Sequence, residues 1–215
     1  MRYVKMIGVL VAAVAALSAV AATSAMASLP EFSPGAAGTT LKGTSKAGHL
    51  EIKGEPPISC ESDTVTGELT GTTKKEGTAT VDFSKCTAFS IFGAHSLEDS
   101  EGTILVKAKL KLCFINEAKE EVGVLTKIEP VHIEVAGKLI VVTGDQVGRI
   151  TPTKKSQKGT YTIEYKQSGG VPTPAGCEGE KEHFSSEINE SGKLIESGEE
   201  TKEEGEFSTA QELKA

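Results

Sequence analysis

Apolar and polar residues alternate over much of this chain, which is the pattern of half-buried β-strands. The longest example is the run 104–114, where apolar residues occupy every second position and Lys107, Lys109 and Lys111 lie between them. This run predicts one long amphipathic strand. Its outer face would carry the lysines, which also discourage edge-to-edge pairing between molecules.

The stretch 58–86 shows the same alternation in a shorter form. Apolar or small residues alternate with polar ones at 65–69 and again at 79–83. Turn-forming residues at 62–63 and across 71–77 would separate the strands. The stretch therefore predicts a meander of three short strands folded on two turns, with Cys60 and Cys86 at its ends.

Further short alternating runs are separated by segments rich in glycine, proline or charge. They lie at 50–52, 122–128, 131–135, 161–165, 184–188 and 207–213. The continuous apolar run 139–142 instead suits a strand that is covered on both faces. We interpret 87–102 and 197–205 as loops, and expect Phe89, Ile91 and Phe92 in the first loop to plug one end of the core.

About ten short strands and no convincing amphipathic helix are typical of an all-β protein. The sequence predicts a single antiparallel β-sandwich or barrel over residues 49–215. The pattern does not decide between these two architectures.

The first 27 residues have the features of a secretory signal peptide. Two basic residues precede an apolar run over 6–22, and the triplet 25–27 is Ala-Met-Ala, which a signal peptidase accepts. We expect cleavage after Ala27, a flexible leader over 28–48 and a secreted or extracytoplasmic chain. The alternative is a retained membrane anchor. No later apolar run is long enough to insert the mature chain stably into a membrane.

The charge of the chain is negative and unevenly placed. The chain has 23 Lys and Arg against 30 Asp and Glu, a formal net charge of −7. From Glu178 to Ala215 there are 12 Glu against 4 Lys, so the C-terminal part carries most of this charge. A negative chain repels phosphate groups, so we expect neither a nucleic-acid partner nor attraction to an anionic membrane.

Four cysteines in an exported chain favour two disulfides, for which three pairings exist. We favour Cys60–Cys86, which closes a local stretch, and Cys113–Cys177, which would tie the central strands to the C-terminal part. The alternative is four free thiols. No pair has the C-x-x-C spacing of a zinc site, so we expect no metal and no cofactor.

Candidate catalytic residues are few. The four histidines are His49, His95, His132 and His183. Next to Glu134, His132 could form an acid–base or metal pair, but alternation places both on an exposed sheet face. The chain has no Gly-x-Ser-x-Gly elbow.

Carbohydrate and calcium sites are also weakly supported. The chain has no Trp, and Tyr161 and Tyr165 fall on the core-facing register, so aromatic platforms for glycans are lacking. The acidic residues Glu98, Asp99 and Glu101 have no calcium-loop spacing. We interpret them as an ordinary turn. The same interpretation holds for the glutamates of 199–206, and we expect no enzyme activity.

Several segments resemble small, uncharacterised exported β-rich proteins of actinobacteria. They are Ser59-Cys60 through 66–68 to Phe83, Lys85 and Cys86, then 121–124, 130–134, 137–139 and 198–201. The resemblance covers most of the mature chain. It implies fold and export, and it carries no catalytic residue.

The expected function is a non-enzymatic exported domain that acts through its surface, structurally or by interaction with an unidentified partner at the cell envelope or outside the cell. One alternative is a carrier that holds a small apolar ligand in a barrel cavity. A second alternative is an extracellular hydrolase with an unrecognised site. An apolar cavity of roughly several hundred Å³ would favour the carrier, whereas a filled core would favour the surface role.

Overall fold

The computed structural model describes residues 29–33, 36–70, 75–153, 160–178, 181–189 and 191–215. The expected signal peptide and its cleavage site lie outside these ranges. The described part forms 17 strands and one short 3-10 helix.

The strand bounds fall into two groups along the chain. The N-terminal strands are β1 (Glu31–Ser33), β2 (Thr40–Ser45), β3 (Gly48–Ile52), β4 (Ile58–Cys60), β5 (Ser62–Thr70), β6 (Glu76–Ser84), β7 (Thr87–Ala88) and β8 (Phe92–Ser96). The others are β9 (Thr103–Asn116), β10 (Glu121–Val135), β11 (Lys138–Thr151), β12 (Thr160–Tyr165), β13 (Gln167–Ser168), β14 (Val171–Pro172), β15 (Phe184–Ile188), β16 (Leu194–Phe207) and β17 (Glu212–Lys214), with helix η1 (Glu117–Lys119) before β10.

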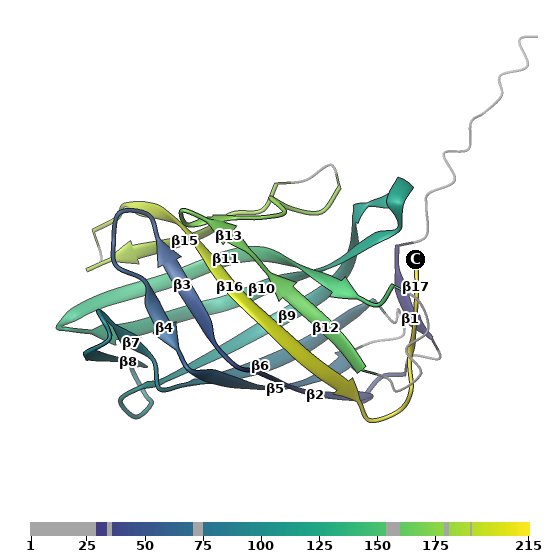
Figure 1. Ribbon diagram of the computed structural model, residues 1–215, viewed down its shortest axis with the longest axis horizontal. Coiled ribbons are helices and arrows are strands. Elements are labelled where there is room, and N and C mark those ends of the chain that lie inside the picture. The colour runs from purple at the N-terminus through teal and green to yellow at the C-terminus, as the bar shows by residue number, and fades with distance from the viewer. Residues whose placement is uncertain (1–28, 34–35, 71–74, 154–159, 179–180, 190) are drawn as a thin grey trace, which may run out of the picture.

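The main sheet is antiparallel and closes on itself, which confirms the all-β prediction and selects a barrel (Figure 1). One ring of pairings runs through β2, β5, β6, β9, β10, β11, β12 and β16, and then returns to β2. A second ring runs through β3, β4, β7, β8, β10, β11, β15 and β16. The long strands β10, β11 and β16 belong to both rings, so the barrel is elongated.

Several strands continue one another along the barrel wall. Strands β4 and β5 are separated only by Glu61, and they pair with β3 and β2 respectively. The predicted turn at Ser62-Asp63 is therefore wrong, and 58–86 is not a three-stranded meander. A register shift between Ile128 and Val131 also lets β10 continue past Pro130, because an irregularity tolerates the missing backbone donor.

The segment 28–48, expected to be a flexible leader, contributes two strands instead. Strand β2 lies between β16 and β5 in the barrel wall. Strand β1 pairs with β17 to form a two-stranded sheet at one end of the barrel (Figure 1). Phe32 of β1 is buried, which ties this end of the chain to the core.

The segment 87–102 holds the short hairpin β7–β8 rather than an irregular loop. The expected plug is wrong, because Phe89, Ile91 and Phe92 are 62%, 74% and 44% exposed. Phe89 lies at the hairpin turn with a left-handed backbone, φ 54°. The core at this end is filled by other side chains, including Ile52, Ile58, Ala88 and Ala94.

The segment 197–205, expected to be a charged loop, lies inside β16. The strand is continuous for 14 residues and reaches from the β15 hairpin to the end covered by β1 and β17. Its odd-numbered residues face the interior, including Glu199 and Glu203, which line cavities there. The prediction failed because glutamates were assumed to face solvent.

Two apolar clusters fill the barrel from its ends. One contains Ile52, Ile104, Ile133, Val142 and Phe184, among other residues. The other contains Phe32, Leu112, Phe114, Tyr161, Phe207 and Leu213 with their neighbours. The buried positions of Tyr161 and Tyr165 match the core-facing register predicted for them.

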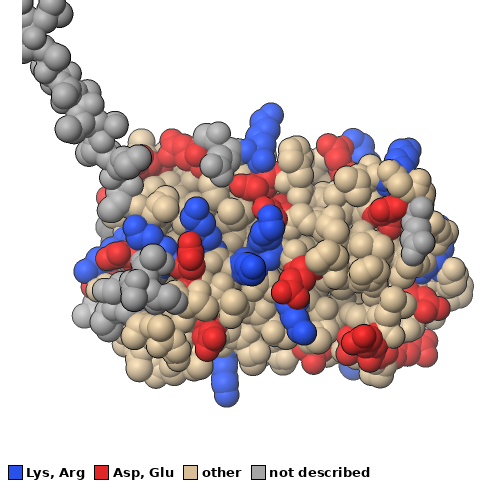
Figure 2. Space-filling model, turned by 180° about the vertical axis from the view of Figure 1, so that it is seen from behind, with Lys and Arg blue, Asp and Glu red and all other residues tan. Residues whose placement is uncertain are grey.

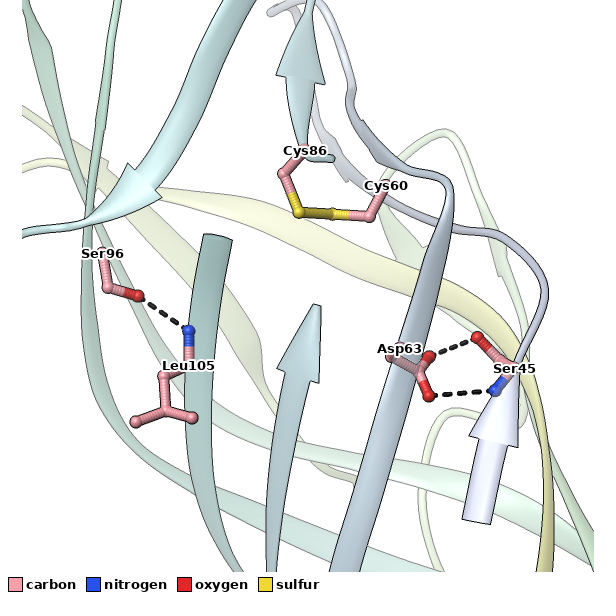
Figure 3. The surroundings of a disulfide bond; sticks show 6 residues. All are labelled: Ser45, Cys60, Asp63, Cys86, Ser96 and Leu105. Atoms are coloured by element: carbon pink, nitrogen blue, oxygen red, sulfur yellow. Dashed lines mark hydrogen bonds between the residues drawn. A yellow bond between two sulfur atoms is a disulfide. The ribbon is translucent and has the colours of Figure 1, made fainter. Parts of the chain in front are cut away.

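Both favoured disulfides are present. The Cys60–Cys86 bond joins the wall beside β4 and β5 to the wall beside β6 and β7 (Figure 3). The Cys113–Cys177 bond ties β9 to the segment between β14 and β15. In the chain-entropy model, closing loops with sequence separations of 26 and 64 stabilises the fold by about 3.5 and about 4 kcal/mol respectively.

The outer surface is polar and mixed in charge. Lys107, Lys109 and Lys111 are exposed on β9, which confirms the predicted lysine-lined face. Basic and acidic side chains are interspersed on the face shown in Figure 2. In the part of the chain that is described, none of the helices has the length and apolar character needed to span a membrane.

Candidate functional site

The barrel interior contains three small cavities that follow one another along its axis. We name them the capped-end cavity, lined by Phe32, Leu69 and Phe207; the central cavity, lined by Ala79 and Ala108; and the disulfide-end cavity, lined by Cys60 and Phe184. Their volumes are about 50, 40 and 60 Å³ respectively. Each adjacent pair shares lining residues, so the three spaces are consecutive.

The central cavity exists because small side chains meet where larger ones would fill the space. Ala79 of β6 pairs directly with Ala108 of β9, and both face the interior. Their neighbours Val65 and Val106 complete an apolar wall. Interiors of eight-stranded barrels are just wide enough to be filled by side chains or to hold one small ligand.

Strand β16 supplies the polar part of the interior. Glu203 lines both the capped-end and the central cavity, and Glu199 lines both the central and the disulfide-end cavity. Only 8% of the surface of Glu203 is exposed. Glu199 is partly buried. The two carboxyl groups therefore lie at the boundaries of the central cavity.

The backbone around Glu199 is held by a glutamine side chain. The Gln146 amide donates from Nε2 to the Glu199 carbonyl at 2.7 Å, and its Oε1 accepts from the Glu199 N–H at 2.9 Å. Strands β12 and β15 each pair with both β11 and β16, but neither reaches the level of Gln146 and Glu199. At this level the two hydrogen bonds from Gln146 take the place of backbone pairing. They fix the strand, and they leave the Glu199 carboxyl group free to face the cavities.

Burial shifts the acid–base properties of these carboxyl groups. Burial, reinforced by the charge of Asp63, raises the pKa of Glu199 from 4.5 to about 8. Burial raises the pKa of Glu203 well above its usual value, and the charges of Glu199 and Asp63 act in the same direction. At neutral pH the interior therefore favours protonated, uncharged carboxyl groups.

Two further polar groups beside this region have partners. The carboxylate of Asp63 accepts from the Ser45 hydroxyl and, at 3.1 Å, from the Ser45 N–H (Figure 3). Burial raises the pKa of Asp63, and these hydrogen bonds oppose that shift. The Tyr165 hydroxyl lies 2.6 Å from Thr126 Oγ1, and burial raises its pKa strongly, with a further contribution from Glu203. Both groups are therefore held in place by hydrogen bonds to other strands.

The histidines lie apart from the cavity carboxyl groups, except for His49. His132 and His183 are exposed, and His95 is half-buried with an unpaired Nδ1. The predicted exposure of His132 is thus confirmed. His49 borders the disulfide-end cavity and an outer groove, where its Nε2 lies 3.6 Å from Glu200 Oε2 and 3.3 Å from Gln167 Nε2.

The outer groove gives no support to a hydrolase. The separation between His49 and Glu200 exceeds a normal hydrogen bond. Within the described ranges, no hydroxyl group hydrogen-bonds to His49. In the same ranges, no three His, Cys, Asp or Glu side chains converge closely enough to hold a metal ion.

The interior carboxyl groups are the feature that sequence reasoning missed. A signal was present, because Ile195, Thr201 and Phe207 fall on the same alternate positions as Glu199 and Glu203. Apolar residues at both ends of an alternating run indicate a strand even where its middle is acidic. Comparisons with protein-family models, with curated proteins and with solved structures find no match for this chain.

Proposed function

We propose that this protein is an exported β-barrel that carries a small, slim apolar ligand in its interior. The observation that carries the proposal is the line of three consecutive cavities inside a closed sheet. Protein interiors are normally packed without such spaces, and an apolar cavity of about 150 Å³ binds benzene. Each cavity here has roughly a third of that volume, so the ligand is small or lies across more than one space.

The volumes of the cavities restrict the size and shape of the ligand, which the sequence alone did not. None of the three reaches the roughly several hundred Å³ of a drug-sized pocket, which was the size expected of a carrier, so the proposal is confined to a ligand much smaller than that. A slim unbranched chain fits consecutive narrow spaces, whereas a fused ring system does not. Side-chain movement at the shared walls would join the spaces when a ligand enters.

Export is part of the same proposal. Two disulfides suit an oxidising compartment outside the cytoplasm. The sequence pattern of 1–27 supports removal of a signal peptide, and the acidic C-terminal part, together with the mixed outer charge, suits a protein that remains dispersed in solution.

Xenon uptake followed by methyl NMR tests the proposal, since xenon enters dry apolar cavities. We expect shifts at Val65, Val106 and Ile128, which line the interior. Ala79→Leu should fill the central cavity and remove the response of the methyl groups around it. The control Thr78→Leu lies on the exposed face of the same strand and should leave that response intact. Absence of any xenon response in the folded protein would refute the carrier function.

A second candidate function is interaction at the cell envelope. It is favoured by exposed apolar residues in and beside the β7–β8 hairpin, at the end of the barrel opposite β1 and β17 (Figure 1). Phe89, Ile91, Phe92 and Leu97 are all more than two-fifths exposed, and the first and third are in edge-to-face ring contact at 6.2 Å. The test is cosedimentation with isolated envelope fractions. Phe89→Ser with Ile91→Ser should abolish cosedimentation, whereas Val171→Ser, at an exposed position elsewhere, should not.

A further inference from the structure

Three polar side chains on the inner face of β16, of which Glu203 and Thr201 are buried and Glu199 is partly buried, lack a hydrogen-bond partner among the described residues. In the described part of the chain, no hydrogen bond or ion pair involves the carboxyl groups of Glu199 or Glu203. Between them lies Thr201, only 3% exposed, whose Oγ1 is buried without a hydrogen bond among these residues. A polar group buried without a partner destabilises the fold, so such groups in a native interior require an explanation.

The positions of these groups relative to the cavities suggest a ligand. Glu199 and Glu203 are four residues apart on one strand, so their Cα atoms are roughly 13 Å apart along the barrel. The central cavity lies between them, and an apolar cavity lies beyond each. A polar ligand group at either carboxyl therefore has room for a hydrocarbon chain beside it.

The charged groups facing this space are almost all acidic. Asp63 of β5 is bound to Ser45, and Tyr165 of β12 is bound to Thr126. Among the described residues that line the central and disulfide-end cavities, His49 is the one basic side chain, and neither lysine nor arginine occurs. The capped-end cavity is lined by two lysines and by two further glutamates, Lys75, Lys111, Glu68 and Glu76.

We infer that the barrel interior binds an aliphatic amine, with the ammonium group on Glu199 or Glu203 and the hydrocarbon chain in the apolar cavities. This inference rests on the proposed carrier function. An ammonium group carries a positive charge and offers N–H donors, which matches a carboxylate acceptor. A fatty-acid carboxylate would instead bring a negative charge into this interior, where no described lysine or arginine lines the central or disulfide-end cavity to pair with it.

Binding of the amine is coupled to loss of a proton. The empty site keeps a proton on the carboxyl group, because burial raises the pKa of Glu199 to about 8. The ammonium ion binds the carboxylate form, so the carboxyl proton passes to solvent and the net charge of the site with its ligand is unchanged. Affinity should therefore rise as the pH increases toward 8, while the amine itself stays protonated up to about pH 10.

Isothermal titration calorimetry with hexylamine, hexan-1-ol and hexanoate tests the inference. Hexylamine should bind at least roughly tenfold more tightly than hexanol at neutral pH. Titration in two buffers of different ionisation enthalpy should show release of up to one proton per amine bound. Glu199→Gln or Glu203→Gln should lower hexylamine affinity roughly tenfold and reduce the proton release, with hexanol affinity unchanged.

The controls separate this inference from the proposed function. Glu206→Gln lies on the exposed side of the same strand and should bind all three probes like the wild type. Glutamine has the shape of a protonated glutamate, and thermal unfolding of each variant verifies that it is folded. If hexanol binds as tightly as hexylamine, the amine inference is wrong and the carrier function stands. If none of the probes binds the folded wild-type protein, both are wrong.

Discussion

At the end covered by β1 and β17, aromatic rings close the barrel interior, whereas carboxyl groups occupy its middle. Phe32 meets Tyr161 and Phe207 in edge-to-face contacts with centroids 5.4 and 4.7 Å apart. At mid-height, Glu199 and Glu203 face cavities instead of side-chain partners. Apolar packing stabilises the end whatever the pH. The middle lowers stability whenever its carboxyl groups ionise, so the two regions should respond differently to mutation and to pH.

The largest expected effect comes from breaking the aromatic end. Phe207→Ala removes a ring that is 7% exposed and packs on both Phe32 and Tyr161. We expect the free energy of unfolding to fall by about 3–5 kcal/mol, since burial is lost and a cavity is left. Urea denaturation followed by circular dichroism measures this change. Phe207→Leu should recover much of the loss, and a cost below about 1 kcal/mol for Phe207→Ala would contradict the packing described.

At the opposite end of the barrel, the Cys60–Cys86 disulfide should contribute nearly as much to the free energy of unfolding. Replacing both Cys60 and Cys86 by alanine should lower the free energy of unfolding by about 3.5 kcal/mol, because the unfolded chain gains conformational freedom. The same urea titration measures this effect. Mild reduction of the wild-type protein should reproduce it once mass spectrometry shows that this bond is open. Equal stability of the double variant and the oxidised wild type would be the contrary result.

The carboxyl groups in the middle of the barrel should make the free energy of unfolding depend on pH. The pKa of Glu199 is raised from 4.5 to about 8 in the fold, so the folded state holds this proton more tightly than the unfolded state. The stabilising contribution is complete below about pH 4.5 and is lost as the pH rises through about 8. For each unit of pKa difference the loss is about 1.4 kcal/mol, so wild-type stability should fall by on the order of 2–4 kcal/mol across this window.

Glu199→Gln should remove the part of that pH dependence that comes from Glu199 and leave the part that comes from Glu203, whose pKa is also raised. The variant should match the wild type near pH 5, where the carboxyl group is protonated in the fold, and exceed its stability near pH 8. Urea titrations at several pH values measure the difference. Glu206→Gln on the outer face should follow the wild-type curve. A variant whose stability falls with pH as steeply as that of the wild type would mean that Glu199 ionises freely in the fold.

The same contrast shows where sequence reasoning succeeds. Alternation in 104–114 predicted β9 and its outer lysines, because every second residue there is apolar or small. The cysteine spacing favoured both disulfides. Burial of Tyr161 and Tyr165 followed from register alone. In each case the local pattern and the final environment agree.

Sequence reasoning failed where the interior is polar or where apolar residues stay outside. Residues 197–205 of β16 are polar or glycine on both faces and give no hydrophobic contrast, so they were expected to form a loop and their inward carboxyl groups were missed. Phe89 and Ile91 were placed in the core because they are apolar, but the β7–β8 turn directs them outward. Closure of the sheet depends on pairings between distant segments, such as β2 with β16, which no local pattern encodes.

The smallest expected effect concerns an exposed isoleucine at the end of the barrel that carries the β7–β8 hairpin. Ile91 and Ile52 belong to the same end of the barrel, but they are 74% and 1% exposed respectively. Ile91→Ala should change the free energy of unfolding by no more than about 0.5 kcal/mol, because it removes little buried surface. Ile52→Ala should cost about 2–5 kcal/mol, because it leaves a cavity in the core. Urea denaturation of the two variants under identical conditions measures both values. A similar loss in both would mean that Ile91 is covered in solution, for example by a second molecule, and the loss from Ile91→Ala would then diminish on dilution.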